Sequence, residues 1–284
     1  MDKLSALNEF TKDLLVRNSA KSTVESYTYQ LRQFFDYFKC VPQTIDVPKI
    51  REYMLYLKID RKYSPSGQNI AISAIQDFYK RVLQIEWPSK VIGRPKVENK
   101  LPIILTQDEI KTVLSGIKNL KHKAILSLMY SSGVRSSELL ALMPEHIDSK
   151  QMYVMVRGGK GNKDRSTLLS TISLTILREY YREYRPKQYL FNGAKDSSPY
   201  SATSLANILK KAVKNTGIKK KISPHTLRHS FATHLLENGV NLFYIKELLG
   251  HKSIKTTLVY LHLCSKDIKK IVNPLDKLFG EGGL

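Results

Sequence analysis

Four short segments in the second half of the chain carry basic or nucleophilic side chains at spacings suited to phosphate chemistry. The first, residues 132–138, reads Ser-Gly-Val-Arg-Ser-Ser-Glu. We expect Gly133 to end one helix and Arg135 to begin the next. That places a two-pronged phosphate donor at a helix N-terminus, which already attracts anions. Glu138, one turn later, could brace the arginine, although by itself the segment is more typical of a surface ion pair.

The second segment, residues 159–165, reads Gly-Lys-Gly-Asn-Lys-Asp-Arg. Its glycines and asparagine predict a turn between two strands. A lysine at the tip of a flexible turn, such as Lys160, can reach into a groove and deliver a proton. By itself this segment is more typical of a solvated hairpin tip.

The third segment, residues 224–229, reads Pro-His-Thr-Leu-Arg-His. On a helix, positions i, i+3 and i+4 share one face, so His225, Arg228 and His229 would be presented together. A zinc site of the His-Glu-x-x-His type needs a glutamate after the first histidine. Thr226 stands there instead, so we expect no metal ligands. Two histidines flanking an arginine would also make a poor apolar core.

The fourth segment contains Leu-Gly-His251 and, nine residues further on, Tyr260. A tyrosine can act as a nucleophile when another group removes its proton or stabilises the phenolate. Nearby cations lower the pKa of a tyrosine because they favour its charged form. The chain has 16 tyrosines, so spacing alone does not select Tyr260.

The first part of the chain is expected to be helical throughout. Residues 1–87 carry four stripes of apolar side chains at spacings of three and four, which predict four short helices in a small all-α domain. A Ser22-x-x-Glu25 sequence predicts a capping box before the second stripe. Residues 88–103, with three prolines and several lysines and arginines, are typical of an extended linker that could lie along a DNA backbone.

The elements that carry the four segments are predicted within residues 104–284. A Thr106-x-x-Glu109 capping box begins a new run of helices. Residues 152–156 and 166–169 predict a strand and its return strand. Helices are then expected at about 172–184, 201–216, 226–237, 242–249 and 266–273. The predicted fold class is therefore mainly α, with a small antiparallel β-sheet in the second domain.

Composition narrows the class of partner. The chain has 284 residues, enough for two domains, and a formal net charge of +21 that both halves share. Such an excess favours a polyanion, nucleic acid first. Cys40 and Cys264 fit no metal spacing and no disulfide framework. Neither a signal peptide nor an apolar run long enough for a membrane span is present, so we expect a cytoplasmic protein.

Together, the four segments resemble the tyrosine recombinase, or lambda-integrase-like, family. Gly-x-Arg-x-x-Glu-Leu, Gly-Lys-Gly-x-Lys, His-x-x-Arg-His, Leu-Gly-His and the final tyrosine occur in family order and with family-like gaps. The chain looks most like compact Xer-type recombinases and mobile-element integrases. The resemblance implies a helical core-binding, DNA-binding domain over residues 1–87 and a catalytic domain over 104–284, which together form a C-shaped clamp on DNA.

The resemblance also implies a reaction and a set of roles. Tyr260 would attack the scissile phosphate to give a 3′-phosphotyrosyl link, without a metal, ATP or any other cofactor. Lys160 would be the general acid, with Lys163 as the alternative, and His225 the base near the tyrosine. Arg135, Arg228 and His251 would stabilise the phosphate, with Glu138 and His229 in support. Further contacts to DNA are expected from Lys90, Arg94, Lys96, Lys163 and Arg165.

The expected partner is double-stranded DNA with specific recombination sites. The resemblance implies a monomer in solution and a homotetramer in the synaptic complex, in which the residues after Tyr260 dock onto a neighbour. A type IB topoisomerase-like enzyme and a DNA-binding regulator on the same scaffold are the alternatives. The DNA sequence, the biological role and the need for accessory proteins are left open, because one sequence encodes none of them.

Overall fold

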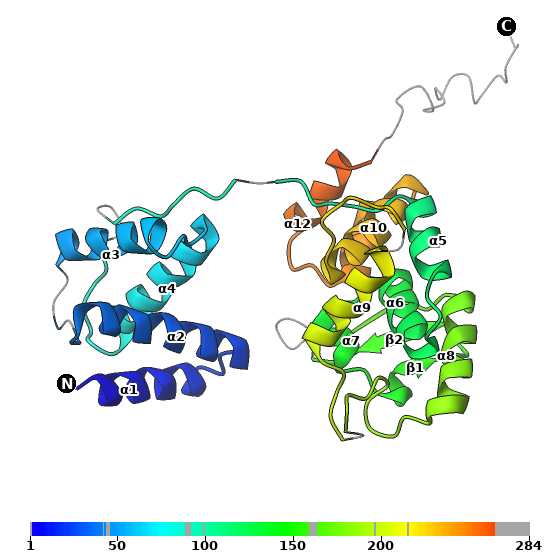
Figure 1. Cartoon of the computed structure of the whole chain (residues 1–284), viewed down its shortest axis with the longest axis horizontal. Coiled ribbons are helices and arrows are strands. Elements are labelled where there is room, and N and C mark those ends of the chain that lie inside the picture. The colour runs from blue at the N-terminus through cyan, green and yellow to red at the C-terminus, as the bar shows by residue number, and fades with distance from the viewer. Residues whose placement is uncertain are drawn as a thin grey trace, which may run out of the picture. The chain divides into compact units, whose positions relative to one another are not determined.

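The computed structural model describes residues 2–41, 43, 46–88, 92–98, 100–158, 164–195, 197–214 and 216–264. The chain divides into two compact units, Met1–Asn99 and Lys100–Leu284 (Figure 1). Most of the described residues are helical, and the described strands form one small antiparallel sheet. The mainly α fold class predicted from the sequence is confirmed.

The first unit is an aromatic-cored bundle of α1 (Lys3–Val16), α2 (Lys21–Phe38), α3 (Val47–Ile59) and α4 (Pro65–Arg81). Phe34 lies at its centre, with its ring centroid 5.1 Å from that of Tyr53. Asp2, Asp46 and Ser64 cap three of the helices. The capping box expected at Ser22 is wrong. Helix α2 begins at Lys21, so Ser22 already lies inside the first turn, and Ala20 occupies the N-cap position without a side-chain bond.

The second unit holds most of the elements. It contains α5 (Gln107–Ser115), α6 (Leu120–Ser132), α7 (Ser136–Leu140), η1 (Pro144–His146), β1 (Ile147–Asp148), β2 (Tyr153–Val156), β3 (Arg165–Leu168), α8 (Thr171–Tyr184), α9 (Ala202–Lys214), α10 (Pro224–Glu237), α11 (Leu242–Leu249), α12 (Lys255–Leu258) and η2 (Val259–His262). The Thr106–Glu109 capping box is confirmed, because each side chain accepts a hydrogen bond from the other residue's backbone N–H. The predicted helix over 266–273 lies outside the described residues.

The sheet of the second unit has the strand order β1-β2-β3, with both pairings antiparallel. The predicted hairpin is confirmed as β2 and β3, in which Val156 lies opposite Arg165. Strand β1 was not predicted, since two residues are too few to show an alternating pattern. Arg165 is therefore the first residue of the return strand.

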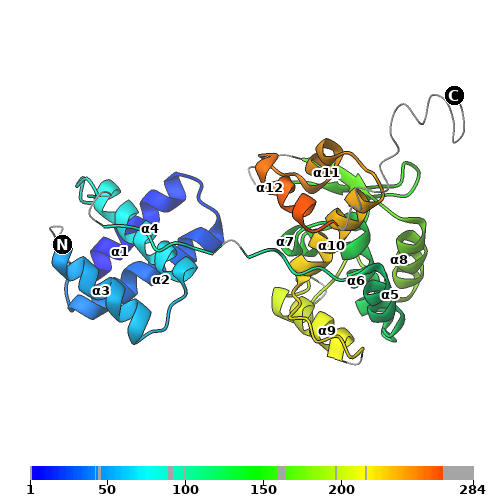
Figure 2. The ribbon, with the colours of Figure 1, turned by 90° about the horizontal axis from the view of Figure 1, so that it is seen from above.

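Helix α6 is the centre of the second unit. It packs against α8 on one side and α10 on the other, as Figure 2 shows from above. Its side chains are buried all round rather than along one stripe, which is typical of a helix enclosed by a core. The C-terminal end of this rigid helix leads straight to Arg135. Among the described residues, no helix is long and apolar enough to cross a membrane.

Candidate active site

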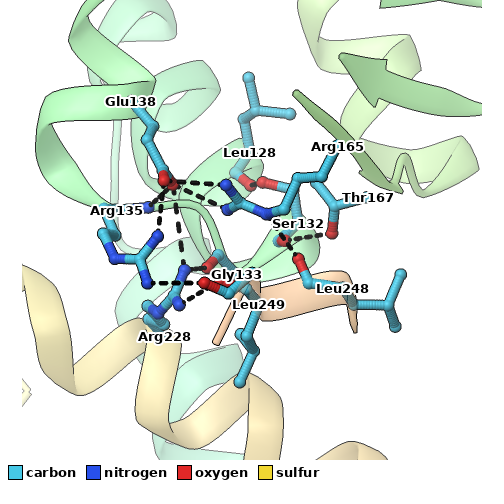
Figure 3. A network of polar contacts seen from close by, with 11 residues as sticks. Leu128, Ser132, Gly133, Arg135, Glu138, Arg165, Thr167, Arg228, Leu248 and Leu249 are labelled. Atoms are coloured by element: carbon cyan, nitrogen blue, oxygen red, sulfur yellow. Dashed lines mark hydrogen bonds and ion pairs between the residues drawn. The ribbon is translucent and has the colours of Figure 1, made fainter. Parts of the chain in front are cut away.

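Residues from all four segments singled out in the sequence meet in the second unit. They come from the loop between α6 and α7, the start of β3, the first turns of α10, and the stretch from the end of α11 through η2. Figure 3 shows Arg135, Arg165 and Arg228 converging on Glu138 from three different elements. Lys160 and Lys163 belong to residues 159–163, which lie outside the described residues.

Arg135 is positioned by the turn that ends α6. Gly133 adopts a left-handed conformation, φ 61°, and its N–H donates to the Met129 carbonyl. The chain can then reverse, so that Arg135 becomes the N-cap of α7, as predicted. The backbone N–H of Arg135 donates to Glu138 Oε2 at 2.7 Å, and its Nη1 donates to Glu138 Oε1 at 2.7 Å. Glu138 therefore braces Arg135 in the way the sequence predicts.

Substituting Gly133 by alanine should destabilise the second unit strongly. A Cβ at this position would lie 2.3 Å from Phe231 Cδ1, and the left-handed conformation is itself unfavourable for alanine. Strain and overpacking together should lower the free energy of unfolding by about 2–5 kcal/mol. Urea unfolding would measure the loss.

Gly217→Ala is the matched control for that variant. Gly217 also has a positive φ, but a Cβ there would meet nothing within 4 Å. It should therefore show the conformational cost alone, about 1–2 kcal/mol. If both variants lost the same free energy of unfolding, Phe231 would be moving away from the new Cβ without any energetic penalty.

Arg228 is a buried cation that ties two helix ends together. Its side chain is 4% exposed. Its Nη1 donates to the Gly133 carbonyl and its Nη2 to the Leu249 carbonyl, both at 2.6 Å. Burial, followed by the neighbouring charge of Arg135, lowers the pKa of Arg228 to about 10. The guanidinium therefore stays charged at neutral pH.

Glu138 is the anion at the centre of the three arginines. Its side chain is 6% exposed. Burial alone would raise the pKa of Glu138, but hydrogen bonds from Arg165 and Arg135 outweigh that effect and lower it to about 2. A buried carboxylate that stays ionised needs such partners. Glu138 thus partly balances a group of positive charges that would otherwise repel one another.

Arg165 was expected from the sequence to contact DNA, but its side chain lies buried in this network. Nη1 and Nη2 donate to the two carboxylate oxygens of Glu138, both at 2.8 Å. Nε donates to the Leu248 carbonyl at 3.0 Å. The charge pattern of the sequence cannot reveal this, because a lysine- and arginine-rich turn is equally typical of an exposed hairpin.

Tyr260 lies inside the second unit, 1% exposed, with its hydroxyl 3.1 Å from His229 Nδ1. Burial raises the pKa of Tyr260, while the charges of Arg228 and Arg135 oppose that rise. The His251 ring is nearly parallel to the tyrosine ring, with centroids 6.4 Å apart. The tyrosine, the histidines and the arginines singled out in the sequence therefore share one site.

The histidine that contacts Tyr260 is His229, whereas the sequence analysis proposes His225 as the base near the tyrosine. The His225 ring centroid lies 6.3 Å from that of His229. Burial lowers the pKa of His225, and it lowers those of His229 and His251 to about 4, helped by neighbouring charges. These imidazoles are therefore neutral at neutral pH and able to accept a proton.

His251 is fixed by Thr257, which the sequence analysis did not single out. His251 Nδ1 lies 2.9 Å from Thr257 Oγ1, and Thr257 is completely buried. The bond turns the other ring nitrogen of His251 away from Thr257. Within the described ranges, no three histidine, cysteine or acidic side chains gather closely enough to hold a metal ion.

The DNA contacts expected from the linker fall in three different settings. Arg94 donates to Ser73 Oγ, Gln76 Oε1 and the Asn69 carbonyl, and so is bound to α4. Lys96 is exposed. Lys90 lies outside the described residues. Arg94 and Lys96 are therefore both exposed, but the guanidinium of Arg94 is already hydrogen-bonded to α4.

Comparison with known proteins identifies the family to which this chain is similar. Residues 104–266 match the model of the phage integrase family, and residues 6–89 match the N-terminal SAM-like domain of phage integrases. Over 281 residues the chain is 34% identical to tyrosine recombinase XerA of Pyrococcus horikoshii, covering 94% of this chain and 92% of the relative. It is also 34% identical over 284 residues to tyrosine recombinase XerD of Oceanobacillus iheyensis, covering 93% and 95%.

The fold is similar to that of a solved lambda integrase dimer bound to a COC′ core site. The TM-score is 0.75, and the match covers 96% of this chain and 99% of that one. Sequence identity is 17%, so this likeness concerns the fold alone.

Proposed function

This chain belongs to the phage integrase family and is a tyrosine-type site-specific DNA recombinase, and on that premise we propose that Tyr260 is its nucleophile. The observation that carries the proposal is the position of the Tyr260 hydroxyl, 3.1 Å from a neutral histidine and within the electrostatic influence of two arginines. Arginines favour the phenolate, and the histidine can take up its proton.

The proposed reaction needs no energy source besides the DNA. Tyr260 Oη attacks the scissile phosphorus, the bond from phosphorus to the 5′-oxygen breaks, and a 3′-phosphotyrosyl link forms. Arg135 and Arg228 donate hydrogen bonds to the non-bridging oxygens, where negative charge gathers in the transition state. A 5′-hydroxyl from a second duplex then attacks the phosphotyrosine and releases Tyr260. The phosphoester energy is conserved, so ATP is not consumed.

We assign the proton from Tyr260 to His229 rather than to His225, because His229 makes the contact. His229→Gln should slow cleavage by about 10²–10⁴-fold, since glutamine can accept a hydrogen bond but cannot hold the proton. Because the pKa of His229 is lowered to about 4, the wild-type rate should fall only when the pH drops toward that value and the ring becomes protonated. Single-turnover cleavage measured from about pH 3.5 to about pH 8, a range that brackets a pKa of about 4, tests both effects.

His262→Gln is the matched control, because His262 is an exposed histidine on η2, two residues from Tyr260. It should cleave at the wild-type rate. A large defect in His225→Gln with none in His229→Gln would return the role to His225.

We propose Lys160 as the general acid that protonates the leaving 5′-oxygen. Lys160→Ala should therefore slow cleavage of ordinary DNA by about 10²–10⁴-fold. A substrate with sulfur at the 5′-bridging position should restore most of the rate, because a thiolate leaves without a proton. Lys163→Ala is the control. If Lys163→Ala slowed cleavage more than Lys160→Ala did, and the 5′-sulfur substrate restored its rate, Lys163 would be the general acid instead.

DNA is the partner of this chain, and the assembly state is a proposal. We propose a monomer in solution and a homotetramer on two paired DNA sites, with the residues after Tyr260 docking onto a neighbour. Those after 264 lie outside the described residues, so the support is the family resemblance. A chain ending at Asp267 should bind one site but fail to pair two in a synapsis gel shift. Normal pairing by this chain would contradict the proposal.

The recombinase function is tested most directly by a plasmid carrying two copies of the protein's own site. Recombination should proceed in EDTA without ATP. A type IB topoisomerase would relax the plasmid without exchanging the sites, and a regulator would bind without breaking any strand. Either result would overturn the proposed reaction.

A further inference from the structure

We propose that Arg165 is a positioning residue of the recombinase, which sets Arg135 through Glu138 and sets the His251 turn through the Leu248 carbonyl. The inference rests on the proposed function, because it concerns the same arginines and histidine. It replaces the DNA contact that the sequence analysis expects for Arg165.

The first support is the way Arg165 uses its side chain. Nη1 and Nη2 bind one oxygen each of the Glu138 carboxylate, and Nε points the other way, to Leu248. The side chain is 10% exposed. A guanidinium whose three nitrogens are all engaged with protein acceptors is poorly placed to bind a DNA phosphate as well. Its planar fork instead fixes the plane of the carboxylate, which a lysine cannot do.

The second support is what that carboxylate holds. Glu138 also accepts from the backbone N–H and Nη1 of Arg135. The orientation that Arg165 imposes on Glu138 is thus passed to the guanidinium of Arg135. Of the two arginines that bind the Glu138 carboxylate in this way, Arg135 is the more exposed, at 21% against 10% for Arg165.

The third support lies at the C-terminal end of α11. In the described structure, three consecutive carbonyls there each accept from a different arginine: Leu248 from Arg165, Leu249 from Arg228 and Gly250 from Arg135. The end of a helix carries partial negative charge, so it attracts such cations. Figure 3 shows the arginines meeting the carbonyls of Leu248 and Leu249.

The turn after those carbonyls leads directly to His251. Gly250 has φ 62°, and a Cβ there would lie 2.8 Å from Arg165 Cδ. Arg165 therefore lies against the backbone of this turn. Because Arg165 begins β3, its hydrogen bonds join this strand to the segments that carry Arg135 and His251. Loss of the Arg165 guanidinium should therefore displace the side chains of Arg135 and His251, although it makes no hydrogen bond to either.

The test compares Arg165→Lys with the wild-type chain on a nicked suicide substrate. Lysine keeps the charge but cannot bind both Glu138 oxygens and Leu248 together. Single-turnover cleavage should fall by about 100-fold, the usual effect of a misplacement of about 1 Å. DNA affinity and its salt dependence should not change. Arg157→Lys is the matched control, since Arg157 is exposed on the same hairpin, and it should cleave normally.

A double-mutant cycle separates positioning from general loss of structure. In an Arg135→Lys background, Arg165→Lys should cost less than about 5-fold, because the two residues act through one network. Independent, multiplying effects would overturn the proposal. So would a salt slope lowered by about 0.9, the signature of a lost phosphate contact. If Arg135→Lys alone leaves cleavage intact, the proposed function fails instead, which keeps the two failures distinct.

Thermal unfolding would show whether Arg165→Lys remains folded. If it does not, Glu138→Gln carries the test, because glutamine keeps the shape of the side chain and weakens the same fork. Slower cleavage with unchanged DNA binding, and no further loss in the Arg135→Lys background, would support the proposal. Wild-type cleavage by Glu138→Gln would overturn it.

Discussion

Tyr260→Phe should abolish the covalent protein–DNA complex while leaving DNA binding unchanged. Phenylalanine keeps the buried ring of Tyr260 and removes the hydroxyl, which is the atom proposed to attack phosphorus. The cost to stability should be limited to the hydrogen bond with His229, about 1–3 kcal/mol. Incubation with a nicked suicide substrate, followed by denaturing electrophoresis, counts the trapped adduct. A gel shift on the same substrate measures binding.

Tyr130→Phe provides the matched control for that experiment. The Tyr130 hydroxyl lies 2.9 Å from His234 Nδ1, a second tyrosine–histidine pair in the same unit. Losing it should cost similar stability but leave the adduct at the wild-type level. Covalent adduct from the Tyr260→Phe chain would show that another residue is the nucleophile.

Arg228→Lys should reduce cleavage by about 10²–10³-fold, the usual effect of removing one donor that stabilises transition-state charge. It should also lower stability, because a single ammonium cannot bind both the Gly133 and the Leu249 carbonyls. Each buried carbonyl left without a partner costs about 1–3 kcal/mol. Single-turnover cleavage and urea unfolding measure the two effects separately.

Arg178→Lys, at an exposed position of α8, should change neither quantity. A cleavage rate for Arg228→Lys that matches the wild type would remove Arg228 from the transition state. If Arg228→Lys cleaved slowly but unfolded with the wild-type free energy, water would be replacing the hydrogen bonds that Arg228 makes to the backbone.

The main features of the fold could be predicted from the sequence because its signals are local. Local patterns predicted a helix near residues 242–249, where α11 lies, and β-branched residues on either side of a turn sequence predicted the β2–β3 hairpin to within a residue. The Thr106 box has both of its partners within one turn. Ser22 failed because a capping motif does not fix the residue at which a helix begins, and the chain before α2 already turns at Ala20.

The sequence indicated which residues gather at the site, but not which of them contact one another. Both His225 and His229 lie on the face of α10 that carries Arg228, so the motif alone could not say which one meets Tyr260. That choice depends on where η2 packs, which is a long-range feature. The contacts of Arg165 could not be predicted for a similar reason. Its partners, Glu138 and the Leu248 carbonyl, are distant in sequence, and a backbone carbonyl leaves no mark in the pattern of side chains.

The double use of Arg228 has a consequence for evolution within the family. Its guanidinium joins the end of α6 to the end of α11, so selection for a folded chain preserves it even where selection for recombination is relaxed. The Tyr260 hydroxyl, by contrast, is held among the described residues by a hydrogen bond with His229, and phenylalanine would fill the same space. In lineages that lose recombination, we expect the tyrosine to drift first and the arginine to persist. A survey of degenerate relatives in which the arginine disappears before the tyrosine would contradict this. We therefore expect a relative that retains only the arginine to fold, and one that also retains the tyrosine to recombine DNA.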